Sequence, residues 1–283
     1  MTIQFSAVIP AQASGDSGPF SVMSIDLQAL GVRASPIAVL DDFRVRGRPF
    51  PPHPHAGFAA VTYVLEDSEG GLRSRNSLGS DSIVGPGGIV WTQAGSGVMH
   101  EELPAESDRQ LHGIQIFVNL SAKNKLVAPE VLQLEKAQMP ERRTAAGDRV
   151  RVVAGLFEDV SSPLVPIEPF NLLDIELRRK IPFSLPKAHN AIVYVLTGDV
   201  LVRADDGGQQ MSGGHALAVH GGGGRVTIEA LHPAHLLFLS GAEIREPVVA
   251  HGPFIMNDLA QVEAAFARYR KGDMGRLEPL PEP

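Results

Sequence analysis

Two pairs of residues in the first half of the chain have the types and the spacing of metal ligands. His53 and His55 flank a proline, and His100 and Glu102 flank a second glutamate. On an extended strand, residues i and i+2 point to one face with their Cα atoms about 6.6 Å apart, so each pair can aim two donor atoms at one ion. Glu101, between the ligands of the second pair, is expected to face away from the ion, with solvent as one place for it to lie.

The two pairs together would supply three neutral imidazole nitrogens and one carboxylate oxygen if their strands met inside a barrel. Such a set leaves one or two positions of an octahedron open, and its mixed chemistry suits Fe(II), Mn, Ni, Cu, Co or Zn better than Ca or Mg. An open position lets a substrate or dioxygen bind the ion, as catalysis at a metal requires. The alternatives are a coordinatively closed ion and an empty polar pocket.

The composition removes several other kinds of chemistry. The chain of 283 residues contains no cysteine, which excludes a disulfide framework, a thiolate nucleophile, an iron–sulfur cluster and cysteine-bound zinc. Its 25 Lys and Arg against 32 Asp and Glu give a net charge of −7, so we expect no direct binding of nucleic acid. Because Met1–Pro10 carries no Lys or Arg and no apolar run approaches about 18 residues, we expect a soluble cytoplasmic protein without a secretory signal or a membrane span.

The pattern of apolar runs and turns predicts an all-β protein. Short β-branched or alternating runs are separated by Gly-rich turns such as Gly85–Gly88 and Gly221–Gly224, which is typical of a sandwich or a barrel. The runs are Ala60–Leu65, Ser82–Val84, Ile89–Thr92, Ile114–Leu120, Val150–Ala154, Asn171–Leu177, Ala191–Leu196, Val200–Arg203, Ala216–Val219, Arg225–Ala230 and Ala234–Leu239. Trp91, the only tryptophan, is expected in the core.

Two segments favour a helix. Asp258 can cap a helix that ends at Gly272, because Gln261 follows the cap three residues on. The apolar face of this helix would consist of Leu259, Val262 and Phe266. Pro129–Lys136 is the second candidate, and we expect the C-terminal helix to pack outside a barrel.

The two halves of the chain resemble each other. Tyr63–Leu65 recurs as Tyr194–Leu196 and Gly87–Gly88 as Gly213–Gly214, at offsets of about 131 and 126 residues. Two copies of one barrel, over residues 1–140 and 141–283, are the simplest account. The positions equivalent by these offsets to the four candidate ligands are Ser184, Pro186, Val226 and Ile228. Since three of these cannot coordinate an ion, the second barrel is predicted to be metal-free.

Four segments of the chain resemble the pirin family, whose members consist of two cupin domains. The segments are HPHAGFAAVTYVLED at 53–67, NSLGSDSIVGPGGIVWTQAGSGVMHEELP at 76–104, LHGIQIFVNL at 111–120 and REPVVAHGPFIMN at 245–257. The resemblance implies two tandem jelly-roll-like cupin barrels with a short C-terminal helix. It also implies one ion per chain in the N-terminal cupin, usually iron and hence Fe(II) here, bound by His53, His55, His100 and Glu102.

The resemblance further implies an activity. Some pirins resemble quercetin 2,3-dioxygenases, which open a flavonol ring with O2 and release carbon monoxide, so the expected substrates are O2 and a small planar aromatic molecule. Glu102 would then also act as the catalytic base, because a carboxylate beside the substrate hydroxyl can accept its proton. The alternative is a non-enzymatic iron-binding regulatory protein that contacts a transcription or metabolic partner. A zinc-dependent sugar isomerase also fits such ligands, but no Lys or Arg cluster for a sugar phosphate accompanies them.

The chain differs from the family after the second histidine. Pirins usually show Arg-Gly-Phe-Glu-Thr there, and this chain has Ala56–Ala60, with Ala56 and Ala59 in place of the arginine and the glutamate. Cupins in general draw a ligand from about this place, so Glu102 is left as the carboxylate ligand. Of His112 and Gln115, on opposite faces of the next strand, one is expected to line the pocket or both to serve packing and hydrogen bonding.

Overall fold

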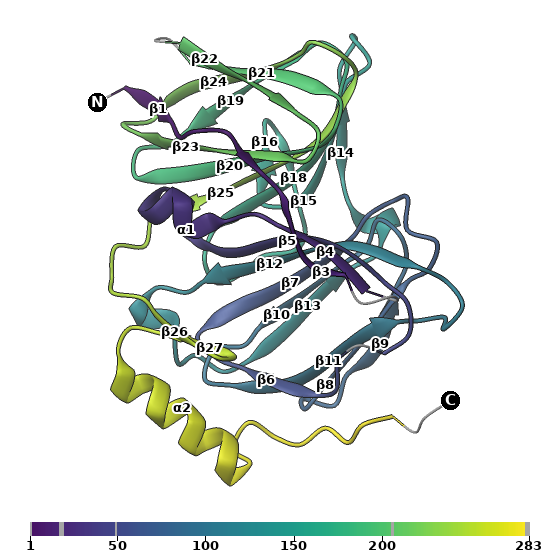
Figure 1. The fold of residues 1–283 in the computed structure, drawn as a ribbon, viewed down its shortest axis with the longest axis vertical. Coiled ribbons are helices and arrows are strands. Elements are labelled where there is room, and N and C mark those ends of the chain that lie inside the picture. The colour runs from purple at the N-terminus through teal and green to yellow at the C-terminus, as the bar shows by residue number, and fades with distance from the viewer. Residues whose placement is uncertain (1, 17–19, 49, 205–206, 281–283) are drawn as a thin grey trace. The chain divides into compact units, whose positions relative to one another are not determined.

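The computed structural model describes residues 2–16, 20–48, 50–204 and 207–280, which form strands for the most part (Figure 1). Their contacts divide the chain into two compact units. The N-terminal barrel comprises Ala13–Ser24, Val39–Lys136 and Ile244–Pro283, and the C-terminal barrel comprises Met1–Gln12, Ile25–Ala38 and Ala137–Glu243. The all-β class, with two barrels and a short C-terminal helix, is confirmed.

The units do not follow a single cut of the chain. A division at residue 140 was expected from the repeat. Instead, Met1–Gln12 and Ile25–Ala38 belong to the C-terminal barrel, and Ile244–Pro283 belongs to the N-terminal barrel. Ile3–Phe5 pairs with the strand His215–Gly221 of the C-terminal barrel, and Phe254 and Met256 pack with Met99 of the N-terminal barrel. An internal repeat identifies equivalent strands, but it carries no information about the partners of the segments that flank them.

The N-terminal barrel contains two antiparallel sheets, and its strands pair in the orders β13-β10-β7-β12-β5-β4-β3 and β6-β11-β8-β9. A hairpin, β26-β27, and helix α2 complete this unit. The bounds are β3 Gln12–Asp16, β4 Phe20–Ser24, β5 Ile37–Val45, β6 His53–His55, β7 Phe58–Val64, β8 Leu72–Asn76, β9 Asp81–Val84, β10 Ile89–Gln93, β11 Val98–Pro104, β12 Leu111–Asn119, η2 Ala122–Asn124, β13 Glu130–Leu134, β26 Val249–His251, β27 Phe254–Met256 and α2 Leu259–Lys271.

The C-terminal barrel repeats the two-sheet plan. Its strands pair in the orders β1-β23-β20-β25-β18-β15-β14 and β19-β24-β21-β22, while β2 pairs with β23 and β16 with β17. The bounds are β1 Ile3–Phe5, β2 Ile9–Pro10, α1 Leu27–Leu30, η1 Gly31–Ala34, η3 Lys136–Gln138, β14 Glu141–Arg143, β15 Arg149–Ala154, β16 Leu156–Phe157, β17 Val160–Ser161, β18 Phe170–Leu177, β19 Lys180–Leu185, β20 His189–Thr197, β21 Asp199–Ala204, β22 Gly207–Ser212, β23 His215–Gly221, β24 Gly224–Ala230 and β25 Ala234–Ala242.

Every run predicted as a strand overlaps a strand of the structure, and Trp91 is buried as expected. The helix expected at Pro129–Lys136 is wrong, because Glu130–Leu134 forms β13 and pairs with Ile89–Gln93 along its full length. The hydrogen bonds that complete the β10 edge outweigh the modest helix preference of so short a segment.

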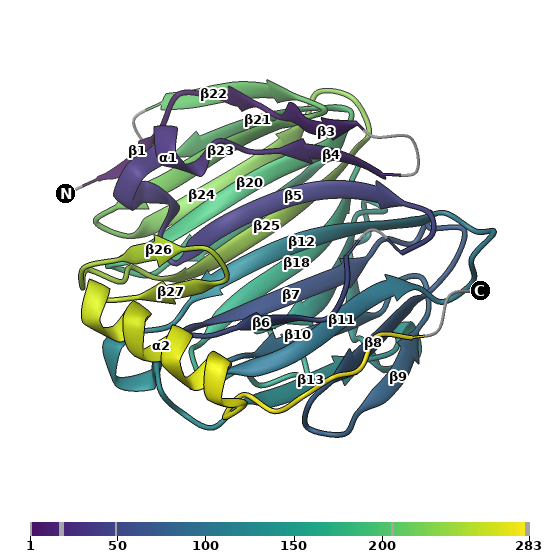
Figure 2. The same cartoon turned by 60° about the horizontal axis from the view of Figure 1, so that its bottom comes forward.

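Helix α2 is confirmed with both of its predicted ends. The Asp258 carboxylate accepts a hydrogen bond from the Gln261 backbone N–H at 2.8 Å, and Gly272 ends the helix in the left-handed region at φ 82°. Helix α2 lies beside the β26-β27 hairpin (Figure 2). Val262 packs into an apolar cluster with Phe254 of that hairpin, whereas Leu259 is exposed and takes no part in this contact. Among the described residues, no helix is long and apolar enough to cross a membrane.

Candidate metal centre

Strands β6 and β11 bring the two predicted ligand pairs together. They pair in antiparallel register with His100 opposite His53 and Val98 opposite His55. Residues directly opposite each other, and those two positions away, share one face of a sheet, so all three imidazoles lie on the same side. Gly57 turns the chain after His55 at φ 84°, and a Cβ there would lie 2.0 Å from the carbonyl oxygen of Ile255, so only glycine lets β27 approach this turn.

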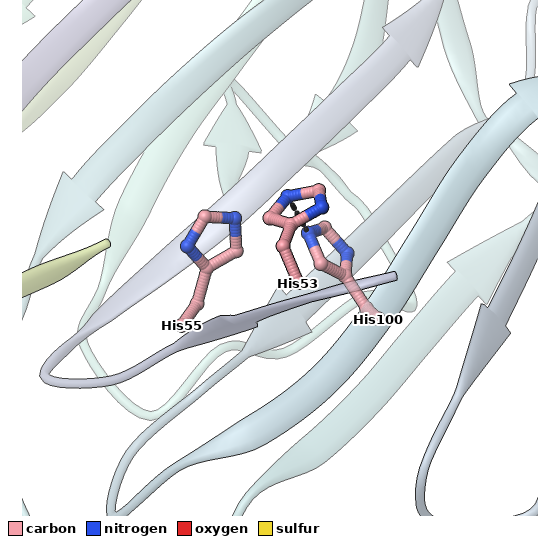
Figure 3. Close-up of side chains that lie close together, drawn as sticks. All are labelled: His53, His55 and His100. Atoms are coloured by element: carbon pink, nitrogen blue, oxygen red, sulfur yellow. Dashed lines mark hydrogen bonds between the residues drawn. The ribbon is translucent and has the colours of Figure 1, made fainter. Parts of the chain in front are cut away.

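The three imidazoles converge (Figure 3), with one nitrogen from each within 4.8 Å of the others. The Nε2 atoms of His53 and His100 are 3.0 Å apart. Outside this cluster, the Nδ1 atom of His53 lies 2.9 Å from the carbonyl oxygen of Pro51, and Nδ1 of His55 lies 3.4 Å from that of Pro253. A carbonyl that accepts the Nδ1 proton leaves Nε2 as the donor atom for an ion.

Burial keeps the imidazoles of His55 and His100 neutral. Burial, followed by the charge of His53, lowers the pKa of His55 to about 3, and the hydrogen bond to Pro253 opposes this only in part. Burial and the neighbouring His55 and His53 hold the pKa of His100 well below its ordinary value. At neutral pH both rings therefore already have the protonation state that a metal ligand needs.

Glu102 lines the same cavity as the three histidines, but it is not one of the residues in the 4.8 Å group. The hydroxyl of Thr62 donates a hydrogen bond to its Oε2 at 2.5 Å, and its buried Oε1 has no hydrogen-bond partner among the described residues. Burial raises the pKa of Glu102 to about 7, against the opposing effect of the Thr62 hydrogen bond. The carboxyl can thus gain or lose a proton near neutral pH.

The cavity around these groups has a volume of about 250 Å³ and lies between the two sheets. Its wall is largely apolar and aromatic, and its remaining polar members are Asp41 and Gln115. The apolar lining residues are Phe20, Val22, Phe43, Val45, Phe50, Leu72, Leu111 and Phe117. Phe50 is 47% exposed and its ring contacts that of Phe20 edge to face at 5.1 Å, so these two rings lie at the opening.

Several residues in or next to the cavity were not predicted from the sequence. Thr62 and Phe50 carry no motif, and Asp41 lies on β5, whose run Ile37–Val45 has no regular alternation of polar and apolar residues. Burial raises the pKa of Asp41, partly offset by a hydrogen bond from Ser24. An acidic residue inside a mostly apolar strand is the one signal that could have indicated it.

Other expectations about single residues have mixed outcomes. Gln115 is the member of its strand that lines the cavity, and His112 instead lies between Asp67 and Asp42, with nitrogen–oxygen distances of 2.7 and 3.0 Å. Glu101 faces away from the histidines as predicted. The expectation that Glu101 lies in solvent is wrong, because its side chain is 4% exposed and forms an ion pair with Arg75 at 2.5 Å.

The departures from the family pattern lie outside the cavity. Ala56 and Ala59 are fully buried, and neither is among the cavity-lining residues. On β7, Phe58 contacts His55 and Thr62 contacts Glu102, so Ala59, at the opposite parity, faces away from the cavity. Replacing a larger family residue at this position therefore leaves the lining of the metal cavity unchanged.

The C-terminal barrel fills the equivalent positions with apolar side chains. In β19 and β24, Phe183 lies opposite Val226 and Leu185 opposite Gly224, as His53 lies opposite His100 and His55 opposite Val98 in β6 and β11. The predicted equivalents Val226 and Ile228 agree with this register. Ser184 and Pro186 are one residue off, and the correct equivalents of His53 and His55 are Phe183 and Leu185. Phe183, Leu185, Val226 and Ile228 all belong to the core.

The donor set of the N-terminal barrel fits a divalent transition metal. It offers three imidazole nitrogens on one face, together with a buried carboxylate oxygen that lacks a hydrogen-bond partner among the described residues and that a cation would satisfy. Within the described residues, no other group of three histidine or acidic side chains converges in this way.

Two barrels of paired antiparallel sheets, the first with three histidines gathered between its sheets, define a two-domain cupin protein. Residues 10–118 match the pirin family and residues 172–275 match the pirin C-terminal cupin domain. The chain belongs to the pirin family, as its sequence led us to expect. It is 34% identical to mouse pirin over 246 residues, which cover 85% of this chain and 83% of the mouse protein.

Solved structures show the same fold. The crystal structure of a quercetin 2,3-dioxygenase from Acinetobacter baumannii is similar with a TM-score of 0.85 and 25% identity, over 98% of this chain and 100% of that one. A bacterial pirin from Escherichia coli, solved in complex with nickel(II), is similar with a TM-score of 0.66 and 20% identity, over 85% of this chain and 100% of that one.

Proposed function

We propose that the chain is a metal-dependent dioxygenase of the quercetin 2,3-dioxygenase type, with O2 and a flavonol-like molecule as substrates. The observation that carries the proposal is the meeting of three imidazoles and one proton-exchanging carboxyl group in an apolar cavity. The likeness over nearly the whole chain to the quercetin 2,3-dioxygenase from Acinetobacter baumannii supports the substrate class. The proposed ligands are His53, His55, His100 and Glu102, with Fe(II) as the first choice of ion and Mn, Ni, Cu, Co or Zn as alternatives.

A divalent ion bound there would supply Lewis acidity toward the substrate hydroxyl and a path for electrons to O2. The residues of the chain prepare the proton transfer. The carboxylate of Glu102, in the same cavity as the three histidines, would accept the proton of the substrate hydroxyl. The hydrogen bond from Thr62 to Oε2 holds the carboxylate in a fixed orientation meanwhile.

The lining of the cavity supports a planar aromatic substrate. Phe43 and Phe117 offer ring faces and edges, and the apolar wall keeps water from the reacting atoms. The volume of about 250 Å³ is close to the lower end of the roughly 300 to 1,000 Å³ usual for small-molecule sites. One ring of a flavonol would thus lie inside the cavity and the other would extend past Phe50 at the opening.

The test is O2 uptake and carbon monoxide release with quercetin as substrate. Protein loaded with Fe(II) should turn over, and His55→Ala should lose at least 100-fold in rate together with its metal. His215→Ala, in the C-terminal barrel, is the matched control and should match the unaltered protein in both measurements. Equal rates in the unaltered protein and His55→Ala would refute the proposal. Iron binding without any O2 uptake would favour the regulatory role that the sequence left as the alternative.

A further inference from the structure

The C-terminal barrel contains a cavity of its own. Its volume is about 800 Å³, and all of its lining residues lie between Gly155 and Ser240. This volume falls within the roughly 300 to 1,000 Å³ of typical small-molecule sites, whereas the metal cavity of the N-terminal barrel is smaller. The cavity is open to solvent on one side, because lining residues such as Leu156 and Arg225 are exposed, so a ligand can reach it.

Three phenylalanine rings line one part of this cavity. The rings of Phe183 and Phe238 stack with centroids 4.4 Å apart and an interplanar angle of 9°, and the centroid of Phe157 lies 5.6 Å from that of Phe183. Phe183 occupies the position that His53 has in the other barrel. Where the N-terminal barrel offers nitrogen donors to an ion, the C-terminal barrel therefore offers aromatic rings.

The surface around the cavity is also apolar. Leu156 is 55% exposed and Val165 is 76% exposed, although both line the cavity. Exposed apolar side chains beside a cavity gain free energy when a ligand covers them, which is why such patches mark binding sites.

The polar part of the lining carries a positive charge. Ser184 and Arg225 lie opposite each other in the β19–β24 register, and both line the cavity. Within the part of the chain that the structure describes, Arg225 has no acidic partner. The carboxylate of Glu158, also at the cavity, lies 3.2 Å from Arg142, which offsets its charge. The unpaired guanidinium thus favours an anionic group on the ligand.

We propose that the C-terminal barrel binds a planar aromatic anion, an aryl carboxylate or sulfonate, without a metal. The aromatic part lies against Phe157, Phe183 and Phe238, and the acidic group is held by Arg225 and Ser184 at the edge of the cavity. This site is independent of the chemistry proposed for the N-terminal barrel.

The test is isothermal titration of the metal-free full chain with 2-naphthoate. We expect one site per chain. Arg225→Gln should weaken binding about five-fold, the effect of losing one charge-assisted hydrogen bond at an exposed position. Ser184→Trp should weaken binding, because the indole at this exposed position would occupy the edge of the cavity beside Arg225, where the acidic group is held.

Two matched variants control the experiment. Arg203→Gln removes an exposed arginine of β21 that does not line the cavity, and His55→Ala alters the other cavity; both should bind 2-naphthoate as the unaltered chain does. Thermal unfolding checks that Ser184→Trp is folded, and Arg225→Gln decides the matter if it is not. Equal affinity in Arg225→Gln and the unaltered chain, loss of binding in His55→Ala, or no binding to the unaltered chain at millimolar 2-naphthoate would each overturn the proposal.

Discussion

Glu101 and Glu102 are neighbours in the chain, but one carboxylate is ion-paired and the other is buried without a cationic partner among the described residues. Glu101 forms an ion pair with Arg75 on the outer face of β11, so its charge is neutralised in place. Glu102 on the inner face receives one hydrogen bond, from Thr62, and burial raises its pKa to about 7. Burial without a nearby cation favours the protonated form of a carboxyl group. Of the two residues, only Glu102 is therefore free to bind an ion or to accept a proton from a substrate.

Glu102→Gln tests this difference. The amide is of similar size to the carboxylate but supplies no negative charge, so the affinity for Fe(II) should fall at least ten-fold. Glu101→Gln is the control: it should retain the metal while losing about 3 kcal/mol of unfolding free energy, since it leaves the half-buried Arg75 with an amide in place of its carboxylate partner. Elemental analysis and urea denaturation measure the two quantities. Full metal content in Glu102→Gln would remove this residue from the ligand set.

His235 provides a pH-dependent contribution to stability. Burial lowers its pKa, but the hydrogen bond to Asp174 at 2.6 Å and the charge of that carboxylate outweigh burial, and the net direction is upward. Because the folded pKa exceeds the unfolded value of about 6.5, the stabilisation is complete below pH 6.5 and is lost as the pH rises through the folded pKa. His235→Gln should therefore cost more unfolding free energy at pH 5.5 than at pH 9 in urea denaturation.

His232→Gln is the matched control for that experiment. His232 also contacts an aspartate, Asp199, at 2.8 Å, but its side chain is 74% exposed, and exposed ion pairs contribute little. A loss in His235→Gln that is the same at both pH values would contradict the assignment of its stabilisation to the charged form.

At the scale of elements, the buried Lys125 joins three parts of the N-terminal barrel. It is 1% exposed, and its Nζ donates to the carbonyl oxygens of Gly57 and Ile255, each at 2.8 Å, and to Oδ1 of Asn119. Burial lowers its pKa to about 8, so the ammonium keeps its charge at pH 7. One side chain thus ties the turn after the His53–His55 strand to β12 and to the C-terminal hairpin.

Lys125→Met should destabilise the protein by about 3 kcal/mol at pH 7, because it leaves buried oxygens without their donor. Lys123→Met, at an exposed position in η2, should stay within about 0.5 kcal/mol of the unaltered chain. Urea denaturation of both variants checks the difference. Equal midpoints would show that the three oxygens find other donors.

Local patterns in the sequence predicted the strands and the ligand pairs, because alternation with a period of two and turn glycines act within a few residues. The same reasoning failed where a distant partner decided the outcome. Glu130–Leu134 became a strand through pairing with β10, and Ser184 was placed one position away from Phe183, since a slip of one residue exchanges the two faces of a strand. Pro253, more than a hundred residues from His55, carries no signal at all.

For the whole molecule, the replacement of the ligands in one barrel predicts one ion per chain. The C-terminal barrel has Phe183, Leu185, Val226 and Ile228 at the equivalent positions, and none of these side chains can bind a metal. Elemental analysis of the Fe(II)-loaded protein should give about one iron per chain. His189→Ala and His215→Ala should leave that ratio unchanged, and a ratio near two that falls in either variant would contradict the prediction.

The exchange of terminal segments between the barrels has a consequence for biosynthesis. Domains near the N-terminus usually fold while the ribosome is still at work on the rest of the chain. Here the first barrel lacks Ile244–Pro283, and with it the carbonyls of Pro253 and Ile255 that contact His55 and Lys125, until the C-terminal barrel has been synthesised. The nascent chain therefore completes the surroundings of His55 only after both barrels have been synthesised, and we expect any metal ion to bind after that point.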